Sequence, residues 1–308
     1  MLRVENLTKS FDGLLAVDHI SFQVKKGEIF GFLGPNGAGK TTSINMICSL
    51  LVPDEGTVYI DGQDIRYGGT KLRKKLGVVP QETALYEELS AEENLHFWGS
   101  FYGLSRAELK ERVAELLDMT GLKDRARERV KHYSGGMKRR LNMAVGMVHH
   151  PDLLLLDEPT VGIDPQARHR MLDMVRDVAA RGTTILYTTH YMEEAEELCD
   201  RLAIIDHGRI LAMGTQQEIQ VVVGEERLIK VNGQFTAEMA AELEKKWDRV
   251  NLVTLKEQEA IFSLPIDFAT GKFIEMLVHL GFKIDNLTIK DPSLDSVFIK
   301  LTGRELRD

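Results

Sequence analysis

The feature that most constrains this chain is a glycine-rich segment, Gly34-Pro35-Asn36-Gly37-Ala38-Gly39-Lys40-Thr41, which fits G-x-x-x-x-G-K-[ST]. It follows an apolar run at 29–33 and precedes residues suited to a helix at 42–50. In that context the glycines let backbone N–H groups converge on one point, and the helix dipole adds positive potential there. Lys40 would reach the β and γ phosphates of a nucleotide, and the Thr41 hydroxyl would coordinate Mg²⁺. The segment predicts an ATP or GTP site, and the complete motif disfavours a ligand-free glycine turn.

Composition sets the expected size and environment. A length of 308 residues predicts about two domains at roughly 150 residues each. With a net charge of −8, the chain as a whole has no positive electrostatic field that would attract nucleic acid, so no nucleic acid is expected as a partner. Cys48 and Cys199 stand far apart and are interpreted as buried thiols in a reducing compartment. No signal peptide and no apolar run near the roughly 20 residues that span a bilayer are found, so we expect a cytoplasmic protein.

The first part of the chain alternates strand and helix signals, which is typical of an α/β domain with a mostly parallel sheet. The run Leu153 to Leu156 does not alternate in polarity, as expected of a parallel strand covered on both faces. Residues 90–149 carry helix signals alone. We therefore predict a P-loop NTPase domain at 1–221 with an all-helical insertion at about 90–149. Strands are expected at 20–24, 29–33, 57–60, 153–156, 183–188 and 202–206, and helices at 42–50, 165–180 and 192–199, with helix-starting capping boxes at Ser90/Glu93 and Ser105/Glu108.

Beyond about residue 222 the order of signals changes to β-α-β-β-α-β, the ferredoxin-like split motif. Asp291 and Pro292 would cap a last helix through Leu301. A small α+β accessory domain is therefore predicted at 222–308. Its elements are expected at 227–232 (strand), 236–247 (helix), 250–256 and 259–265 (strands), 268–281 (helix) and 283–290 (strand).

Acidic residues end the predicted strand at 153–156. Asp157 is placed to hold Mg²⁺, directly or through water, and Glu158 to act as general base on the attacking water. Upstream, Ser134 is a plausible N-cap, and Gly135 and Gly136 open a helix that can point at an anion. Each signal is weak alone, because acids and capped helices are common, but their order after a P-loop is informative.

That order, P-loop, Gln81, Ser-Gly-Gly, Asp-Glu and His190, resembles the ATP-binding cassette (ABC) ATPases, the motor subunits of ABC transporters. The resemblance covers residues 1 to about 220. It implies that Gln81 senses Mg²⁺ or the γ-phosphate and faces a membrane subunit, and that His190 contacts the γ-phosphate. Catalysis would then involve Glu158, His190 and Gln81, and Mg²⁺ would be held by Thr41, Gln81 and Asp157. The nucleotide-binding loop would comprise Gly34, Pro35, Asn36, Gly37, Ala38, Gly39, Lys40, Thr41 and Thr42.

The resemblance also implies roles for residues whose plainer interpretations stay open. Phe11 would stack on adenine, although it could be ordinary core. Asp164 matches the D-loop and could equally be an N-cap before Pro165. The signature, Ser134, Gly135 and Gly136, departs from its usual flanks, with Tyr133 replacing Leu and Met137 replacing Gln. The basic run 138–140 is expected to be a solvated helix face.

One P-loop and one signature imply a cassette that cannot complete its own site. In this family ATP lies between the P-loop of one cassette and the signature of another, so a homodimer or heterodimer is implied. The segment 291–298, with Leu301-Thr302-Gly303-Arg304, resembles the subfamily of daunorubicin-resistance and sodium-export ATPases. An exporter subunit is therefore implied. It would be peripheral at the inner face of the membrane and dock a separate transmembrane permease through residues 82–102.

Two other functions fit this sequence less well. A soluble cassette protein acting on ribosomes or DNA would usually carry two cassettes or a long coiled-coil insertion, and neither is found. A regulatory cassette without turnover is disfavoured by the presence of Glu158 and His190.

Overall fold

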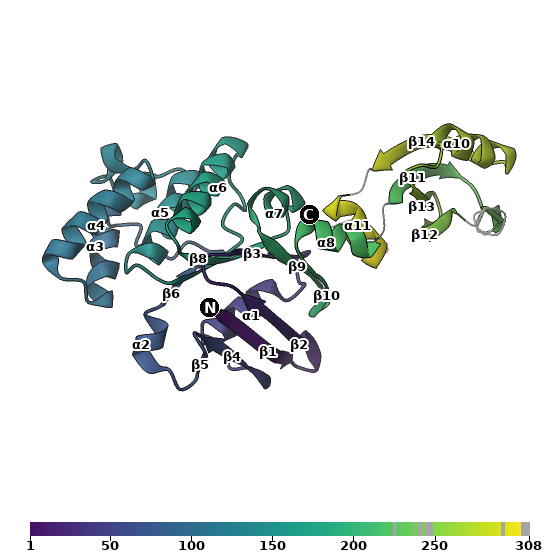
Figure 1. Ribbon diagram of the computed structural model, residues 1–308. Helices are drawn as coiled ribbons and strands as arrows, with labels where there is room; N and C mark the ends of the chain where they lie inside the picture. Colours follow the sequence, from purple (N-terminus) through teal and green to yellow (C-terminus); the bar gives the residue numbers. More distant parts are fainter. Residues whose placement is uncertain (224–225, 237, 240–241, 244–248, 291–292, 303–308) are drawn as a thin grey trace. The chain divides into compact units, whose positions relative to one another are not determined.

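The computed structural model describes residues 1–223, 226–236, 238–239, 242–243, 249–290 and 293–302. The chain divides into two compact units, Met1–Ile210 and Leu211–Asp308. The first contains a mostly parallel sheet, an antiparallel sheet and a helical region, and the second contains one antiparallel sheet with helices (Figure 1). The expected domain boundary at 221 stays a prediction; it falls inside α8 (Gln216–Val223).

The central sheet of the first unit has the strand order β10-β9-β3-β8-β7-β6. The pairs β3/β8, β3/β9, β7/β8 and β6/β7 are parallel. Every residue of β3, β7 and β8 is buried, which explains why Leu153 to Leu156 show no alternation. The strands are β3 (Ile29–Leu33), β6 (Leu76–Val79), β7 (Leu153–Asp157), β8 (Thr184–Thr189), β9 (Arg201–Asp206) and β10 (Arg209–Gly214).

A second, antiparallel sheet has the order β2-β1-β4-β5. Helix α1 (Lys40–Ile47) contacts β1 and β2 of this sheet and β7 of the central sheet, so it links the two. Phe22 of β2 stacks on Phe30 and Phe32 of β3, with ring centroids 5.4 Å apart in both pairs. The strands are β1 (Leu2–Phe11), β2 (Leu14–Val24), β4 (Glu55–Ile60) and β5 (Gln63–Asp64), with α2 (Gly69–Arg73) following.

The predicted helical insertion is present between β6 and β7. Both capping boxes are confirmed: the Ser90 hydroxyl accepts from Glu93 N at 3.2 Å, the Glu93 carboxylate accepts from Ser90 N at 2.8 Å, and Ser105 with Glu108 repeats the arrangement. These bonds satisfy backbone donors that a helix start leaves free. The helices are α3 (Ala91–Tyr102), α4 (Arg106–Met119) and α5 (Gly135–Met147), with short 3₁₀ turns at Lys123–Arg125 and Val130–His132.

Helices α6 (Pro165–Ala180) and α7 (Met192–Leu198) complete the first unit. Helix α6 begins and ends where the sequence predicts. In the part of the chain that the structure describes, no helix is long and apolar enough to cross a bilayer.

The second unit has an antiparallel sheet of order β12-β13-β11-β14. Numbered along the chain this is 2-3-1-4, the order that a β-α-β-β-α-β split motif generates. The expected helix at 236–247 and the cap at 291–292 fall wholly or partly outside the described residues. The elements are β11 (Glu226–Gln234), β12 (Asn251–Lys256), β13 (Glu259–Pro265), α10 (Thr270–His279), β14 (Lys283–Lys290) and α11 (Leu294–Thr302).

Candidate nucleotide-binding and catalytic site

The glycine-rich loop joins β3 to α1, as its sequence predicts. Gly39, the N-cap of α1, has φ +103°, and a Cβ there would lie 2.5 Å from the Ala16 carbonyl oxygen. A Cβ at Gly34 would lie 2.2 Å from the Ile205 carbonyl oxygen. Only glycine fits at these two positions. The loop borders a cavity of about 310 Å³ lined by Ala16, Asn36, Gly37, Gly39, Lys40, Thr41, Thr42, Gln81 and Glu158.

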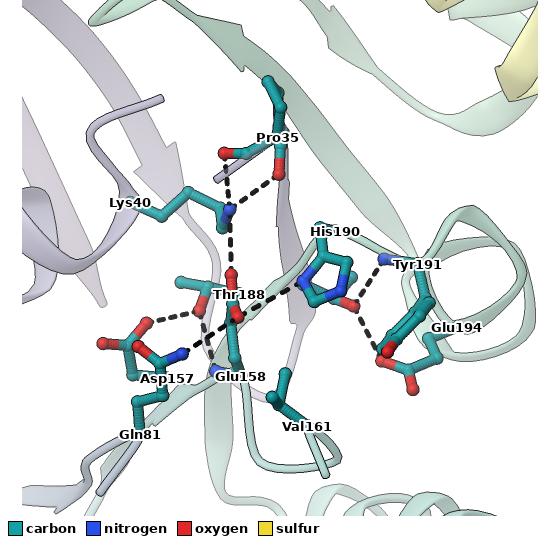
Figure 2. Close-up of polar contacts among 12 residues, drawn as sticks. Pro35, Lys40, Gln81, Asp157, Glu158, Val161, Thr188, His190, Tyr191 and Glu194 are labelled. Carbon is teal, nitrogen blue, oxygen red and sulfur yellow. Dashed lines mark hydrogen bonds and ion pairs between the residues drawn. The ribbon is translucent and has the colours of Figure 1, made fainter. Parts of the chain in front are cut away.

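The Lys40 ammonium is buried within this loop, with 4% of the residue exposed. Its Nζ donates to the carbonyl oxygens of Gly34 at 2.6 Å and Pro35 at 2.9 Å, and pairs with Glu158 Oε1 at 2.9 Å (Figure 2). A phosphate entering the loop would therefore compete with Glu158 for this cation. The sequence places Lys40 on the phosphates, but nothing in the motif indicates the pair with Glu158.

Glu158 is the point on which the predicted catalytic residues converge. Its Oε2 lies 3.2 Å from His190 Nδ1 and 3.4 Å from Gln81 Nε2 (Figure 2). Burial raises the pKa of Glu158, but the hydrogen bond with His190 and the positive charge of Lys40 outweigh it and lower the pKa to about 2. Glu158 is thus a carboxylate just after β7 with three cationic or hydrogen-bonding partners, Lys40, Gln81 and His190.

The backbone of Glu158 is held in an uncommon conformation, with φ +46°. Thr188 of the neighbouring β8 stabilises it, because Glu158 N donates to Thr188 Oγ1 at 3.0 Å and to the Thr188 carbonyl at 3.2 Å. A non-glycine residue in the left-handed region persists only where its surroundings determine it, and such residues cluster at functional sites.

Asp157 and Thr41 provide the oxygen donors that Mg²⁺ would use. Asp157 is 2% exposed, and its Oδ1 accepts from Thr188 Oγ1 at 2.7 Å. Burial raises the pKa of Asp157 above its usual value, and the hydrogen bonds from Thr188 and Thr41 offset only part of that rise. Within the described ranges no group of three or more His, Cys, Asp or Glu could hold a metal. A carboxylate and a hydroxyl are oxygen ligands of the kind that Mg²⁺ accepts alongside phosphate oxygens and water.

His190 lies after β8 in a loop that a second acid secures. Glu194 is 1% exposed, and its Oε2 accepts from Tyr187 Oη at 2.9 Å and from Thr189 Oγ1 at 2.7 Å. Thr189 Oγ1 in turn accepts from Tyr191 N at 2.9 Å. Sequence reasoning missed Glu194; the available signal was an acid four residues after His190, where α7 begins.

The remaining predicted residues lie outside the phosphate cavity. Phe11 is 45% exposed at the end of β1, which rules out the ordinary-core alternative. Ser134 and Gly135 are exposed at the start of α5, and the Ser134 hydroxyl accepts from Met137 N at 3.3 Å. Asp164 caps α6, since its Oδ1 accepts from Ala167 N at 3.0 Å. Gly136 is buried, and a Cβ there would lie 2.8 Å from that of Ala167.

The expectation of a solvated face at 138–140 is wrong. Arg139 is half-buried, and its guanidinium donates to the carbonyl oxygens of Gln81 and, at 3.0 Å, Val161. Arg140 donates to the Thr120 carbonyl oxygen at 2.5 Å. These partners come from distant loops that pack on α5, so the local charge pattern could not reveal them.

We expect Glu158→Gln to lower the melting temperature of the nucleotide-free protein at pH 7, because Lys40 loses its buried anionic partner. Lys40 keeps its bonds to the Gly34 and Pro35 carbonyl oxygens, but the loss of a hydrogen bond between charged groups costs about 1.5–3 kcal/mol. The folded pKa of about 2 lies below the ordinary 4.5. Stabilisation by Glu158 is therefore present above pH ~4.5 and lost as the pH falls towards ~2. Calorimetry from pH 7 to pH 3 should show the difference from wild type shrinking; a constant difference would contradict the assigned pKa.

The fold and this constellation define a P-loop ATPase. Comparison with known proteins agrees: residues 17–161 match the ABC transporter family. Over the full chain and the full relative, the sequence is 42% identical to the linearmycin resistance ATP-binding protein LnrL of Bacillus subtilis. It is 40% identical to the Nod factor export ATP-binding protein I of Cupriavidus metallidurans, over 100% of this chain and 99% of that one. It is 35% identical to the daunorubicin resistance ATP-binding protein DrrA3 of Streptomyces coeruleorubidus, over 99% of this chain and 97% of that one.

Solved structures give the same assignment. An ATP-binding subunit of an ABC transporter superposes with a TM-score of 0.67 at 34% identity, covering 73% of this chain and 93% of that one. A dimeric cassette bound to ADP and phosphate superposes with a TM-score of 0.64 at 26% identity, covering 70% and 98%. The chain belongs to the ABC transporter family and is an ATP-binding subunit with ATPase activity. The predicted fold class and family are confirmed.

Proposed function

We propose that this chain is the motor of an exporter, in which ATP closes a pair of cassettes and hydrolysis at Glu158 reopens it. The observation that carries the proposal is the convergence of Lys40, Gln81 and His190 on one carboxylate beside the phosphate loop. Export is supported by the relatives named for drug resistance and Nod factor export. Their match over the full chain favours a transporter subunit over a soluble cassette factor.

Glu158 would act as general base on water, and its partners would regulate its basicity. A base works best when its pKa lies near the operating pH, so a pKa of about 2 is low for this task. When Lys40 turns to the β and γ phosphates, Glu158 loses its nearest positive charge and its pKa should rise. The carboxylate would thus become a stronger base only once ATP is bound.

The other site residues would hold and orient the nucleotide. Thr41 and Asp157, with Gln81, would hold Mg²⁺, which when bound neutralises phosphate charge and orients the γ-phosphate. His190 would donate to a γ-phosphate oxygen, and its position is fixed by the loop that Glu194 secures. The exposed Phe11 ring would stack on adenine. Phe11 lies at the end of β1, clear of the core.

The signature would serve the ATP of a second cassette. Ser134 and Gly135 are exposed, and neither lines the cavity beside Lys40. Their backbone N–H groups open α5, a helix start suited to an anion. A homodimer and a heterodimer both satisfy this arrangement, and the dimeric cassette among the structural neighbours supports such pairing.

The transmembrane partner would dock beside Gln81, on residues 82–102. Phe97 and Phe101 of α3 are 43% and 72% exposed, and the preceding Tyr86 is 46% exposed. The rings of Tyr86 and Phe97 are in edge contact at 4.8 Å. An exposed aromatic group of this kind favours a protein interface. Docking there would hold the subunit at the inner face of the membrane.

The residues after 221 would act outside nucleotide binding, because every proposed phosphate-handling residue lies in Met1–Ile210. We propose an accessory role in dimer contact or regulation for this domain.

Ser134→Arg should abolish hydrolysis while leaving ATP binding by the monomer intact, because Ser134 serves the opposite nucleotide. Mixing it with Lys40→Ala creates dimers that have one site with both elements intact and one with neither. The mixture should recover ATPase activity that neither variant has alone, measured by phosphate release. Weakened ATP binding by monomeric Ser134→Arg would contradict the in-trans arrangement.

A further inference from the structure

Arg139 connects two loops of the catalytic site to the helix that carries the signature. It lies in α5, and its guanidinium donates to the carbonyl oxygen of Gln81 and, at 3.0 Å, to that of Val161. The guanidinium is a rigid planar fork, so binding two carbonyls with one group fixes the distance between them. Lysine, a point donor on a flexible stem, would not reproduce this geometry.

Both carbonyls belong to residues that contact Glu158. The Gln81 side chain reaches Glu158 Oε2 at 3.4 Å, and Val161 N donates to the Glu158 carbonyl oxygen at 3.3 Å. In Figure 2, Gln81 and Val161 lie on either side of Glu158. Arg139 is therefore connected to Glu158 indirectly in two ways. One connection runs through Gln81, which contacts the Glu158 side chain, and the other through Val161, which contacts the Glu158 backbone.

Glu158 needs such support because its backbone lies in the left-handed region, at φ +46°. Thr188 secures its N–H, and the Val161 turn secures its carbonyl. Without Arg139, the Val161 carbonyl oxygen would lose its hydrogen bond from α5, and the Glu158 backbone would be freer to relax towards an ordinary conformation.

Asn142, less than one turn further along α5, binds the same loop as Arg139. Its Nδ2 donates to the Pro80 carbonyl oxygen at 3.3 Å, and its Oδ1 accepts from Ala84 N at 3.0 Å. The segment around Gln81 is thus fastened to α5 at two points. Because Ser134 is the N-cap of α5, Arg139 gives a displacement of the signature a hydrogen-bonded route to the turn that follows Glu158.

We propose that Arg139 is a positioning residue that keeps Glu158 in its catalytic geometry and transmits movement of α5 and the Gln81 loop to it. The proposal rests on the proposed role of Glu158 as base. Arg139 is not itself catalytic, since it binds backbone carbonyls and lines no part of the phosphate cavity.

The test compares Arg139→Met, which keeps the stem and removes the donors, with Lys138→Met as the matched control. Lys138 is the preceding residue, and its ammonium pairs with Glu87. We expect Arg139→Met to lower kcat about tenfold or more, as misplacement of a catalytic group does, with KM for ATP and melting temperature close to wild type. Arg139→Lys should recover only part of kcat, and Lys138→Met should match wild type. If Arg139→Met does not fold, Arg139→Lys carries the same comparison.

A double-mutant cycle distinguishes positioning of Glu158 from a general structural effect. In single-turnover assays, Arg139→Met should add no further loss in a Glu158→Gln background, because the group it positions is already gone. The same fold loss in both backgrounds, or a kcat of Arg139→Met equal to that of wild type, would overturn the proposal. A wild-type hydrolysis rate in the Glu158→Gln single variant would contradict the proposed role of Glu158 as base, whatever the rate of Arg139→Met. Failure of the proposed function can therefore be distinguished from failure of the proposal for Arg139.

Discussion

Replacing Lys40 with alanine is expected to abolish ATP hydrolysis, with a loss of at least about 100-fold, the scale seen when a preorganised electrostatic donor is removed. The ammonium is buried in the glycine-rich loop and is the charge that the β and γ phosphates would meet there. Steady-state phosphate release would measure the loss of hydrolysis, and binding of a fluorescent ATP analogue would measure any loss of nucleotide affinity.

The loss should come without unfolding. Lys40→Ala removes one buried ion pair with Glu158, while the hydrophobic core beside the loop is untouched. Circular dichroism should match wild type. Lys25→Ala, a change at an exposed lysine after β2, serves as the control and should keep full activity. Normal ATPase rates in Lys40→Ala would contradict the assignment of the phosphate loop.

Glu158→Gln is expected to arrest the protein with ATP bound and the cassettes closed. The amide keeps the shape of the side chain but cannot accept the proton of the attacking water. It also removes a negative charge near the γ-phosphate; two like charges ~4 Å apart repel by about 4 kcal/mol at an effective dielectric of about 20. Hydrolysis should fall about 100-fold or more while ATP stays bound, as measured by retention of radiolabelled nucleotide after rapid desalting. A wild-type rate would show that Glu158 is not the base.

The sequence predicted those parts of the fold that local pattern determines. The buried runs of β3 and β7 and the Pro165 start of α6 are strong signals, and the structure confirms them. Strand β1 was missed because its pairing is irregular: the register shifts between Val4 and Leu7, where Asn6 has φ +47°. Strand β6 was missed because it is only four residues long.

The site shows the same division between local and long-range information. Lys40 could be named from the complete glycine-rich motif, and Gln81 and His190 from the resemblance to the ABC ATPases that the order of the motifs carries. The groups that hold them were harder to predict. Thr188 and Arg139 act through contacts between segments that are distant in the sequence, whereas Glu194 contacts Thr189 nearby in the sequence. Arg139 in particular looks like surface charge until its carbonyl partners are known.

The most direct test of the account is the molar mass of Glu158→Gln with and without ATP, by size-exclusion chromatography with light scattering. We predict a monomer of 34.7 kDa without nucleotide and about twice that mass with ATP, compared in the presence and absence of Mg²⁺. Adding Ser134→Arg to the same chain should prevent the dimer. If Glu158→Gln hydrolyses ATP slowly yet keeps the monomer mass at saturating ATP, ATP-driven closure of paired cassettes is contradicted for the isolated subunit.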